Sequence, residues 1–201
     1  MKVILVRHGE SIANSKGIHQ GQRVDTSLSE KGKEQAIKAA QALKNEKIEA
    51  IYSSDLKRAM ETAQEIAKLH NLKVIPDKRL REFDSGDFTH LKDRWDRFVK
   101  LKDSESKRLG IESYEVKIPG GESELDHFHR VRDFFREIKN HKGNIVLVGH
   151  GGTNKLFFGA AESVPREEMY SVPQDNSAIS VVELTKKGNK IIKVNDIKHL
   201  N

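Results

Sequence analysis

Cysteine is absent from this sequence, and proline and aromatic residues are scarce. The 201 residues include no Cys, 4 Pro and 6% Phe, Trp and Tyr. The absence of cysteine excludes disulfide bonds, thiolate nucleophiles and Cys-ligated zinc or iron–sulfur centres. Long apolar runs are also missing, because the longest aliphatic runs, residues 3–6 and 145–148, are far shorter than the ~20 residues that span a bilayer. We therefore expect no membrane segment.

The length of the chain predicts one domain. Domains contain roughly 100–200 residues, and a chain of 201 residues can bury about 70% of its unfolded surface without further cross-links. The apolar run at the N-terminus follows a single Lys2 and has no small-residue cleavage site of a signal peptide after it. We expect a single domain over residues 1–201 and a cytoplasmic location.

The charge is basic but evenly distributed. Lys and Arg number 36 against 30 Asp and Glu, a formal net charge of +6. A basic protein can contact polyanions, yet no Lys/Arg block and no alternation of basic and aromatic residues is present. Nucleic acid is therefore a disfavoured partner. The oligomeric state does not follow from the sequence, so a homo-oligomer stays open.

Short apolar runs alternate with helical patterns along most of the chain, which is typical of a parallel sheet covered by helices. Residues 9–26 are rich in Gly and polar side chains and predict a loop. Ser27-x-x-Glu30 matches a capping box for a helix containing Ala36, Ala40 and Leu43, and Asp55 can cap the next helix. Strands are expected at residues 3–6, 48–53, 74–75 (stopping before Pro76) and 145–148, further helices at 125–138 and around 156–158, and a C-terminal β-hairpin at 178–184 and 190–197.

The alternating pattern is interrupted at about residues 80–120. This stretch is dense in charge, contains the only Trp and ends in Pro119-Gly120-Gly121. We interpret it as a partly helical, cap-like insertion over one end of the sheet. The predicted fold class is therefore α/β: a three-layer α/β/α sandwich with a mostly parallel central sheet, a helical insertion over the active site and a C-terminal β-hairpin.

Two of the predicted strands end in the same way. His8 stands two residues after the apolar run 3–6, and His150 stands two residues after the run 145–148; a glycine follows each histidine. In open α/β sheets, ligands bind outside the carboxyl ends of the strands. If the two strands are neighbours, both imidazoles face one crevice, and the glycines allow a ligand to approach the backbone.

Two histidines in a crevice could serve either a metal ion or an anion. Zinc or iron would require a third ligand, such as Glu10, Glu82 or Asp84. Arg7 stands next to His8, however, and its fixed positive charge opposes a divalent cation. Arg58 falls in the first turn of a predicted helix, whose free N–H groups also favour an anion. A phosphate pocket without metal is the better interpretation.

Other phosphate-binding motifs do not match. No Gly-x-x-x-x-Gly-Lys-Ser/Thr run is present, so a nucleoside triphosphate has no cradle. Gly149-x-Gly151-x-x-Asn154 only approximates the dinucleotide fingerprint.

Taken together, these residues resemble the histidine phosphatase superfamily, also called the phosphoglycerate mutase-like fold. The similarity spans residues 3–184, and five motifs in the family's order make it specific. They are Arg7-His8-Gly9-Glu10-Ser11, Ser53-Ser54-Asp55-Leu56-x-Arg58-Ala59-x-x-Thr62-Ala63, Leu80-Arg81-Glu82-Phe83-x-x-Gly86, Pro119-Gly120-Gly121-Glu122-Ser123 and Gly149-His150-Gly151-Gly152.

The resemblance implies roles for individual residues. His8 would attack phosphorus through Nε2 and form a phosphohistidine, oriented by a hydrogen bond from Nδ1 to the backbone. The remaining residues would bind the phosphoryl oxygens (Arg7, Arg58 and His150), contact the substrate (Asn14, Gln20 and Gly151) or, at the family's acid position, supply a proton to the leaving alcohol and later activate water (Glu82). The resemblance implies no metal and no cofactor.

The branch of the family is less sharply defined. The stretch Glu82-Phe83-Asp84-Ser85-Gly86 resembles phosphatases rather than the Glu-Arg-His-Tyr-Gly of phosphoglycerate mutases, but Thr89-His90 replaces the Glu-Gly that often follows in phosphatases. We expect metal-independent hydrolysis of a small phosphorylated metabolite. A 2,3-bisphosphoglycerate-dependent phosphoglycerate mutase is the alternative, and fructose 2,6-bisphosphate hydrolysis a further option. A phosphate- or nucleic-acid-binding module without turnover is the rival from another class.

Overall fold

A computed structural model of the chain describes residues 1–161 and 166–201 and contains one six-stranded sheet with the order β3-β2-β4-β1-β5-β6. Strands β3, β2, β4 and β1 run parallel, whereas β5 is antiparallel to β1, and β6 to β5. The sheet is therefore mostly parallel, as predicted. The strands are β1 (Lys2–Arg7), β2 (Ile48–Ser53), β3 (Val74–Pro76), β4 (Asn144–Gly149), β5 (Ile179–Thr185) and β6 (Gly188–Asp196).

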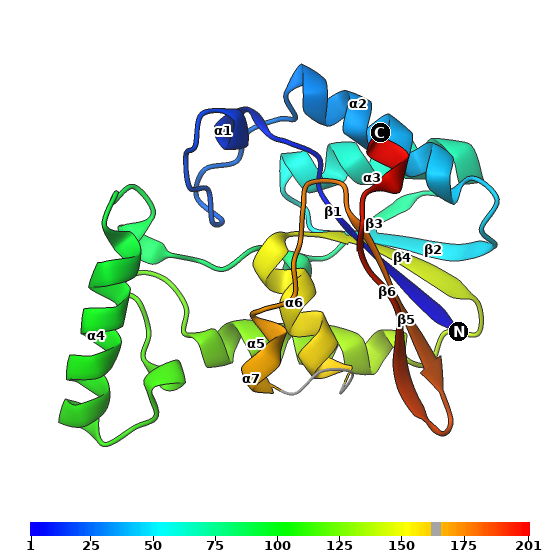
Figure 1. Cartoon of the computed structure of the whole chain (residues 1–201). Coiled ribbons are helices and arrows are strands. Elements are labelled where there is room, and N and C mark those ends of the chain that lie inside the picture. Colours follow the sequence, from blue (N-terminus) through cyan, green and yellow to red (C-terminus); the bar gives the residue numbers. More distant parts are fainter. Residues whose placement is uncertain (162–165) are drawn as a thin grey trace.

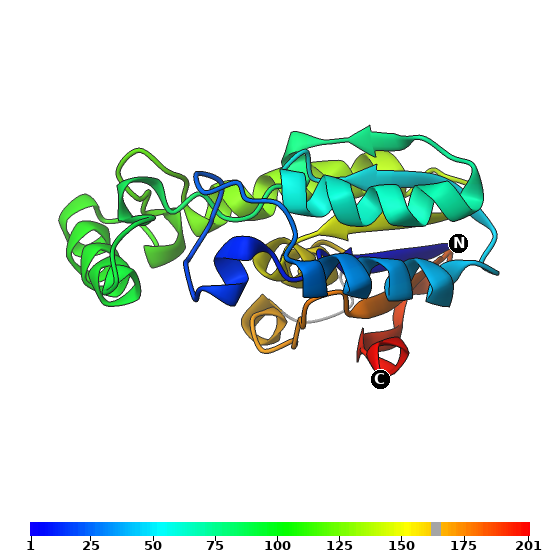
Figure 2. The same ribbon diagram turned by 90° about the horizontal axis from the view of Figure 1, so that it is seen from above.

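Helices cover both faces of the sheet (Figures 1 and 2). One face carries α2 (Glu30–Leu43) and α3 (Lys57–His70), and the other carries α5 (Glu124–Ile138) and α6 (Gly151–Ala160). This arrangement confirms the predicted three-layer α/β/α sandwich. The shorter helices are α1 (Ile12–Ser15) and α7 (Arg166–Met169), and single 3-10 turns lie at η1 (Lys78–Leu80) and η4 (Lys198–Leu200).

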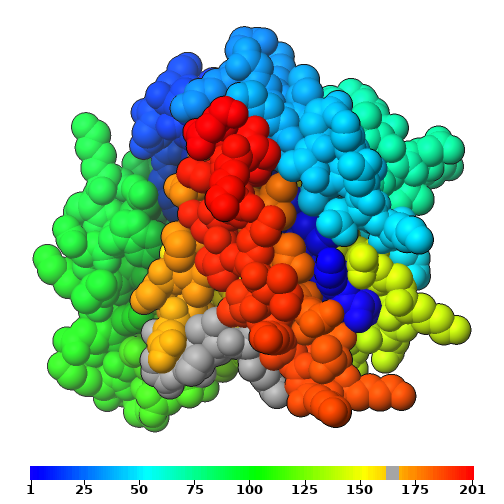
Figure 3. Space-filling model, turned by 45° about the vertical axis from the view of Figure 1, so that its right-hand side comes forward, coloured from blue at the N-terminus to red at the C-terminus, as the bar shows by residue number. Residues whose placement is uncertain are grey.

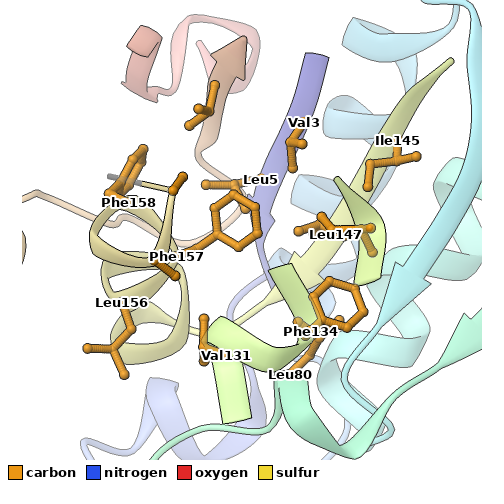
Figure 4. Close-up of a cluster of buried hydrophobic side chains, with 14 of the residues drawn as sticks. Val3, Leu5, Leu80, Val131, Phe134, Ile145, Leu147, Leu156, Phe157 and Phe158 are labelled. Carbon is orange, nitrogen blue, oxygen red and sulfur yellow. The ribbon is translucent and has the colours of Figure 1, made fainter. Parts of the chain in front are cut away.

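The central strand β1 has apolar residues on both of its faces because both faces are covered. Successive side chains of a strand point in opposite directions, so β1 contributes to two separate hydrophobic clusters. Val3 and Leu5 pack with α5 and α6, whereas Ile4 and Val6 pack with α2 and α3. Figure 4 shows the first cluster, which includes Leu147 of β4, Phe134 of α5 and Phe157 of α6.

Helix α2 begins two residues later than the capping-box pattern predicted. Its N-cap is Ser29, whose hydroxyl accepts the N–H of Gly32, rather than Ser27. The reason is a pairing with a distant segment: the carbonyl of Ser27 accepts the N–H of Ile12, and Leu28 forms a β-bridge with Ser11. These contacts keep the chain extended up to the real N-cap.

Asp55 does not cap helix α3, contrary to the prediction. The N-cap is Leu56, which makes no side-chain capping bond. The carboxylate of Asp55 instead forms two 2.6 Å hydrogen bonds with the guanidinium of Arg81, a bidentate pairing stronger than a neutral cap bond. Asp25 supplies the missing cap, because its carboxylate accepts the N–H of Lys57 at 2.9 Å.

Two further boundaries differ from the predictions. The predicted loop 9–26 contains α1, which Ser11 and Asn14 close with a reciprocal capping box. Strand β3 includes Pro76, which pairs with Ser53. Proline is compatible with this position because β3 is the edge strand, where one side of the backbone needs no partner.

The predicted helical insertion is present and stands at the carboxyl ends of β1 and β4 (Figure 1). It contains α4 (Arg94–Leu109), which ends at Gly110 in the left-handed conformation, and the 3-10 turns η2 (Gly86–Phe88) and η3 (Ser113–Glu115). Phe98 is the buried residue of α4, and its ring lies 5.8 Å from that of Phe83. The insertion is thus fixed to the segment that carries Glu82.

The C-terminal hairpin is present as predicted, formed by β5 and β6. Figure 3 shows the C-terminal segment (red) at the surface beside α2 (light blue), and Lys38 of α2 donates a hydrogen bond to the carbonyl of Leu200. Among the described residues, no helix has the length and hydropathy needed to cross a membrane.

Candidate active site

The two strands that end in histidine are neighbours in the sheet. β1 and β4 pair in parallel with Arg7 opposite Gly149, and the N–H of His8 donates to the carbonyl of Gly149 at 3.0 Å. This register places the imidazole rings of His8 and His150 with their centroids 5.1 Å apart. The condition on which the predicted crevice depended is therefore met.

The surroundings of His8 fix its tautomer. Nδ1 lies 2.7 Å from the carbonyl oxygen of Gly9, and a carbonyl can only accept, so Nδ1 carries the proton. Nε2 therefore has a free lone pair, and it accepts a hydrogen bond from Nε of Arg58 at 3.3 Å. Burial, reinforced by the charges of Arg58 and Arg7, holds the pKa of His8 well below 6.5. The ring is neutral near pH 7, with Nε2 available as a nucleophile.

Arg58 is an almost fully buried cation. Its side chain is 1% exposed, and burial lowers its pKa to about 10 although the charges of Glu82 and Asp25 oppose that change. The guanidinium donates to the carbonyl of Gly21 at 2.9 Å and lies 3.7 Å from the carboxylate of Asp25. A buried charge is costly unless it has partners, so these contacts indicate a position that the fold maintains.

His150 has one occupied and one unoccupied ring nitrogen. It is 0% exposed, and its Nε2 lies 2.8 Å from the hydroxyl of Ser54. Its Nδ1 is buried and has no hydrogen-bond partner among the described residues. Burial, together with the charges of Arg58 and other cations, holds the pKa of His150 well below 6.5. A buried polar atom without a partner typically costs about 1–3 kcal/mol, which a ligand at this place would recover.

Arg7 carries a second unpartnered atom. One of its terminal nitrogens donates to the carbonyl of Gln174, whereas its Nε is buried and has no hydrogen-bond partner in the part of the chain that the structure describes. Burial lowers the pKa of Arg7, and the charges of Glu82 and Asp175 partly oppose that effect. A Cβ atom on Gly151 would lie 3.8 Å from Nε of Arg7, so this donor adjoins the first turn of α6.

Glu82 is held by backbone N–H groups. One carboxylate oxygen accepts the N–H of Gly152 at 3.0 Å and the other accepts that of Phe83 at 2.9 Å. Gly152 lies in the first turn of α6, where free N–H groups favour a carboxylate. A Cβ atom at position 152 would collide with a carboxylate oxygen of Glu82. Glycine is therefore required here by the close approach of the acid.

A residue that the sequence did not single out fixes the backbone around Glu82. The guanidinium of Arg130 in α5 donates to three carbonyl groups of the segment 79–82, at 2.7, 2.6 and 2.9 Å, and binds the carboxylate of Glu122 at 3.0 and 2.8 Å. Glu122 also accepts the N–H of Asp84. We name Arg130 and Glu122 the acid clamp, because together they hold the chain on both sides of Glu82. A charged residue on an amphipathic helix gives no signal of such a role before the fold is known.

Other contacts at the strand ends were also not predicted. Thr62 accepts the N–H of Gly9, and Asn176 donates to the carbonyl of His8 at 3.0 Å. Ser54 and Thr62 belong to the second motif of the resemblance, so their positions were visible in the sequence, but their partners were not. These contacts hold the backbone on both sides of the nucleophile candidate.

The remaining predicted residues divide into two groups. Gly151 begins α6 and lines the cavity described below. The amide oxygen of Asn14 accepts the N–H and the hydroxyl of Ser11, and that of Gln20 accepts the hydroxyl of Thr26 at 3.2 Å. The described contacts of these two amides therefore lie within their own loop, and substrate binding by Asn14 and Gln20 stays a prediction.

The metal alternative finds no support in the geometry. Among residues 1–161 and 166–201, no three His, Asp or Glu side chains come together as a ligand set. Glu10 binds Ser29 and Lys31, and Asp84 lies 3.3 Å from the guanidinium of Arg23. Two of the three acids considered as a third ligand thus have other partners.

A cavity of about 400 Å³ opens beside these residues. Arg7, Glu82, Gly151 and Gly152 line one part of it, and residues of α4 and α5 line another. This volume lies within the range of about 300–1,000 Å³ that is usual for small-molecule sites. The arrangement of a neutral imidazole, buried guanidinium groups and a helix N-terminus suits a phosphoryl group.

Comparison with known proteins agrees with this chemistry. Phosphoserine phosphatase 1 of Hydrogenobacter thermophilus is 36% identical to this chain over 202 residues, which cover 100% of this chain and 94% of that protein. A metal-independent phosphoserine phosphatase of Arabidopsis thaliana is 32% identical and matches 100% of this chain and 83% of its own length.

Mutases and solved phosphatase structures are similar as well. The 2,3-bisphosphoglycerate-dependent phosphoglycerate mutase of Bartonella bacilliformis is 33% identical over 83% of this chain and 84% of its own length. The mycobacterial glucosyl-3-phosphoglycerate phosphatase in complex with VO3 superposes with a TM-score of 0.78 at 30% identity, covering 96% of this chain and 98% of that one. Residues 3–197 match the histidine phosphatase superfamily (branch 1). With its two strand-end histidines and their arginines in place, this chain belongs to the histidine phosphatase superfamily.

Proposed function

We propose that this protein hydrolyses phosphomonoesters through a phosphohistidine on His8, without a metal ion. Phosphatases among the family members described above support the reaction class. The observation that carries the proposal is the lone pair on Nε2 of His8, set among buried donors, of which Nε of Arg7 has no partner within residues 1–161 and 166–201. A phosphoryl oxygen of the substrate would accept the hydrogen bond of Arg7 Nε while the phosphorus atom faces Nε2 of His8.

In the first half-reaction, Nε2 of His8 attacks phosphorus and the bond from phosphorus to the ester oxygen breaks. Arg58 already points an N–H at Nε2, and on substrate binding this donor turns to a phosphoryl oxygen and leaves the lone pair free. Arg7 and His150 bind the other oxygens. Donors that are in place before the reaction stabilise the charge of the transition state without further reorganisation.

The leaving alkoxide needs a proton, which Glu82 supplies. Its carboxyl group lines the cavity and is held by the N–H groups of Gly152 and Phe83. General acid catalysis of this kind typically contributes about 10²–10⁴-fold. In the second half-reaction, Glu82 takes a proton from water, the water oxygen bonds to phosphorus, the P–N bond breaks, and inorganic phosphate leaves with the ring of His8 neutral again.

A phosphoglycerate mutase is the second candidate because mutases are among the relatives. A mutase must retain a bisphosphate while it reorients, which requires cations without partners near the site. Two cations of the insertion are engaged in ion pairs: Arg97 with Asp93 at 2.9 Å and Lys102 with Glu124 at 2.9 Å. Neither is free to hold a second phosphate in this arrangement, which supports hydrolysis as the first candidate. A small phosphorylated metabolite as substrate and a cytoplasmic location stay predictions.

The decisive experiment combines turnover with trapping. We expect hydrolysis of p-nitrophenyl phosphate that persists in EDTA and is inhibited by vanadate, and an acid-labile ³²P adduct after quenching with labelled substrate. His8→Ala should abolish both turnover and adduct while circular dichroism stays native. An adduct that forms equally in His8→Ala would contradict the proposal. Release of phosphate from 3-phosphoglycerate, against conversion to 2-phosphoglycerate in the presence of 2,3-bisphosphoglycerate, separates hydrolase from mutase.

A further inference from the structure

A continuous row of aromatic rings runs along the cavity. His19, Trp95, Phe98, Phe83 and His127 follow one another with ring centroids 6.1, 6.2, 5.8 and 5.8 Å apart. These separations lie within the range of about 4.5–7 Å at which aromatic pairs attract. All five residues line the cavity, and we call them the ring wall.

The ring wall leaves aromatic surface uncovered. Trp95 remains 53% exposed although His19, Phe98 and the guanidinium of Arg94 all contact it. Phe98 is 3% exposed and touches both Trp95 and Phe83, so it fixes their mutual position from behind. An exposed aromatic surface held rigidly at a cavity is typical of a binding site.

The ring wall is also uncharged near neutral pH. Burial lowers the pKa of His19 to about 4, and burial with the charge of Arg130 holds the pKa of His127 well below 6.5. The hydroxyl of Thr153 donates to the carbonyl of Arg81, so it accepts the Nε2 proton of His127. Both imidazoles therefore present neutral rings.

The two other charged residues of the cavity already have partners. Glu124 pairs with Lys102 at 2.9 Å, and Lys155 donates to the carbonyl of Tyr170 at 2.8 Å. Apart from these two residues and from Arg7 and Glu82 at the phosphoryl end, the cavity is lined by uncharged residues, so the ring wall suits an uncharged flat group.

We propose that the ring wall is the subsite for the alcohol half of the substrate, and that this half carries an aromatic ring which stacks on Trp95 and Phe83. The inference rests on the proposed function, because the cavity is continuous: Arg7, Glu82 and Gly152 line the part that would take the phosphoryl group. A volume of about 400 Å³ accommodates such an ester as a whole. The substrate class is thus a phosphomonoester of a ring-bearing alcohol.

The test uses two esters that differ only in the ring. Propyl phosphate and 3-phenylpropyl phosphate have leaving alcohols of nearly equal acidity, so the ratio of their kcat/KM values reports ring binding rather than chemistry. We expect a preference of about tenfold for the ring, expressed in KM. O-Phosphoserine should be a poorer substrate than the ring-bearing ester. Equal kcat/KM values for the propyl and phenylpropyl esters, or a higher value for O-phosphoserine, would overturn the subsite.

Variants of α4 provide the matched comparison. Trp95→Ala should lower kcat/KM for 3-phenylpropyl phosphate more than kcat/KM for propyl phosphate, so that the preference falls about fivefold or more, and Trp95→Phe should retain most of it. Val99→Ala, on the same helix but 63% exposed and outside the cavity lining, should change neither value. An unchanged preference in Trp95→Ala would contradict the proposal.

A binding measurement separates the subsite from the reaction. Propyl and 3-phenylpropyl phosphonate cannot be hydrolysed, and calorimetry gives their affinities without turnover. Tighter binding of the phenylpropyl compound, lost in Trp95→Ala, would support the subsite even if no ester were hydrolysed, in which case only the proposed function would fail. Equal affinities would overturn the subsite even in an active phosphatase.

Discussion

At the scale of single residues, the site depends on which atoms carry protons. Gly9 and Arg58 leave one tautomer for His8, with the proton on Nδ1 and the lone pair on Nε2. Glu82 is positioned by two N–H groups and can face the leaving oxygen. The proposed mechanism therefore combines a nucleophile that is neutral near pH 7 with an acid that must deliver one proton.

Glu82→Gln tests the acid at this scale. The variant is nearly isosteric but has no acidic proton, so hydrolysis of an alkyl phosphate should slow by about 10²–10⁴-fold. Hydrolysis of p-nitrophenyl phosphate should slow much less, because p-nitrophenolate leaves without a proton. Steady-state kcat values for both esters provide the measurement. If both esters slowed by the same factor, Glu82 would not be the acid.

At the scale of elements, the segment that carries Glu82 is fixed by helices on either side of it. The first turn of α6 holds the carboxylate, and α5 holds the backbone through the acid clamp of Arg130 and Glu122. The hydroxyl of Thr153 in α6 adds a 2.7 Å hydrogen bond to the carbonyl of Arg81. A segment without regular structure thereby acquires a defined position.

Arg130→Lys tests whether the acid clamp serves catalysis. An ammonium group cannot bond three carbonyls and a carboxylate at once, so Glu82 should lose its alignment. We expect kcat for an alkyl phosphate to fall by about 10–100-fold, and kcat for p-nitrophenyl phosphate to fall clearly less. Arg136→Lys is the control, since Arg136 lies on the same helix and its one ion pair among the described residues is with Asp133, at 3.6 Å. Equal losses for both esters in Arg130→Lys would show that the clamp acts on the fold alone.

At the scale of the whole molecule, three neutral imidazoles are built into the interior. His8, His127 and His150 are all buried, and burial is the largest cause of their low pKa values. In the unfolded chain each histidine would titrate near 6.5. The folded protein thus gives up protons that the unfolded chain would bind.

This difference predicts a loss of stability in weak acid. Below pH 6.5 the unfolded state binds more protons than the folded state, so the free energy of unfolding decreases as the pH falls from 6.5 toward the folded-state pKa values. Each imidazole that stays neutral in the folded protein lowers the free energy of unfolding by about 1.4 kcal/mol for every pH unit below 6.5. The free energy of unfolding, measured by urea titration between about pH 8 and pH 5, should be constant above pH 7 and decline steeply below pH 6.5.

His127→Gln should make that decline shallower, because the variant has one imidazole fewer that the unfolded chain protonates and the folded protein does not. Carboxylates with lowered pKa values, such as Asp55 beside Arg81, cannot explain the same slope. Their contribution to the free energy of unfolding is lost only when the pH falls below their ordinary pKa of about 4. An identical slope in His127→Gln, or stability that does not change between pH 7 and pH 5, would contradict the assignment.

Much of the fold was predictable because the signals for it are local. The buried strands at residues 3–6 and 145–148 follow from continuous apolar runs, and α5 follows from its apolar spacing. The errors occurred where a distant group decided the outcome: the pairing of Leu28 with Ser11 moved the start of α2, and Arg81 drew Asp55 away from the start of α3. Helix boundaries depend on such competition and cannot be derived from the adjacent residues alone.

By itself, the sequence determined the chemical groups of this protein and their order: histidine after each of two buried strands, arginine beside one of them, and an acid at the third motif. Only the tertiary structure decided that β1 and β4 are neighbours, that Arg58 donates to Nε2 of His8, and that Arg130 holds the segment of Glu82. The physical reason is the sequence distance over which each property is decided. Periodicity and residue type are properties of a short stretch, whereas a hydrogen bond across 48 residues exists only once the chain has brought its two partners together.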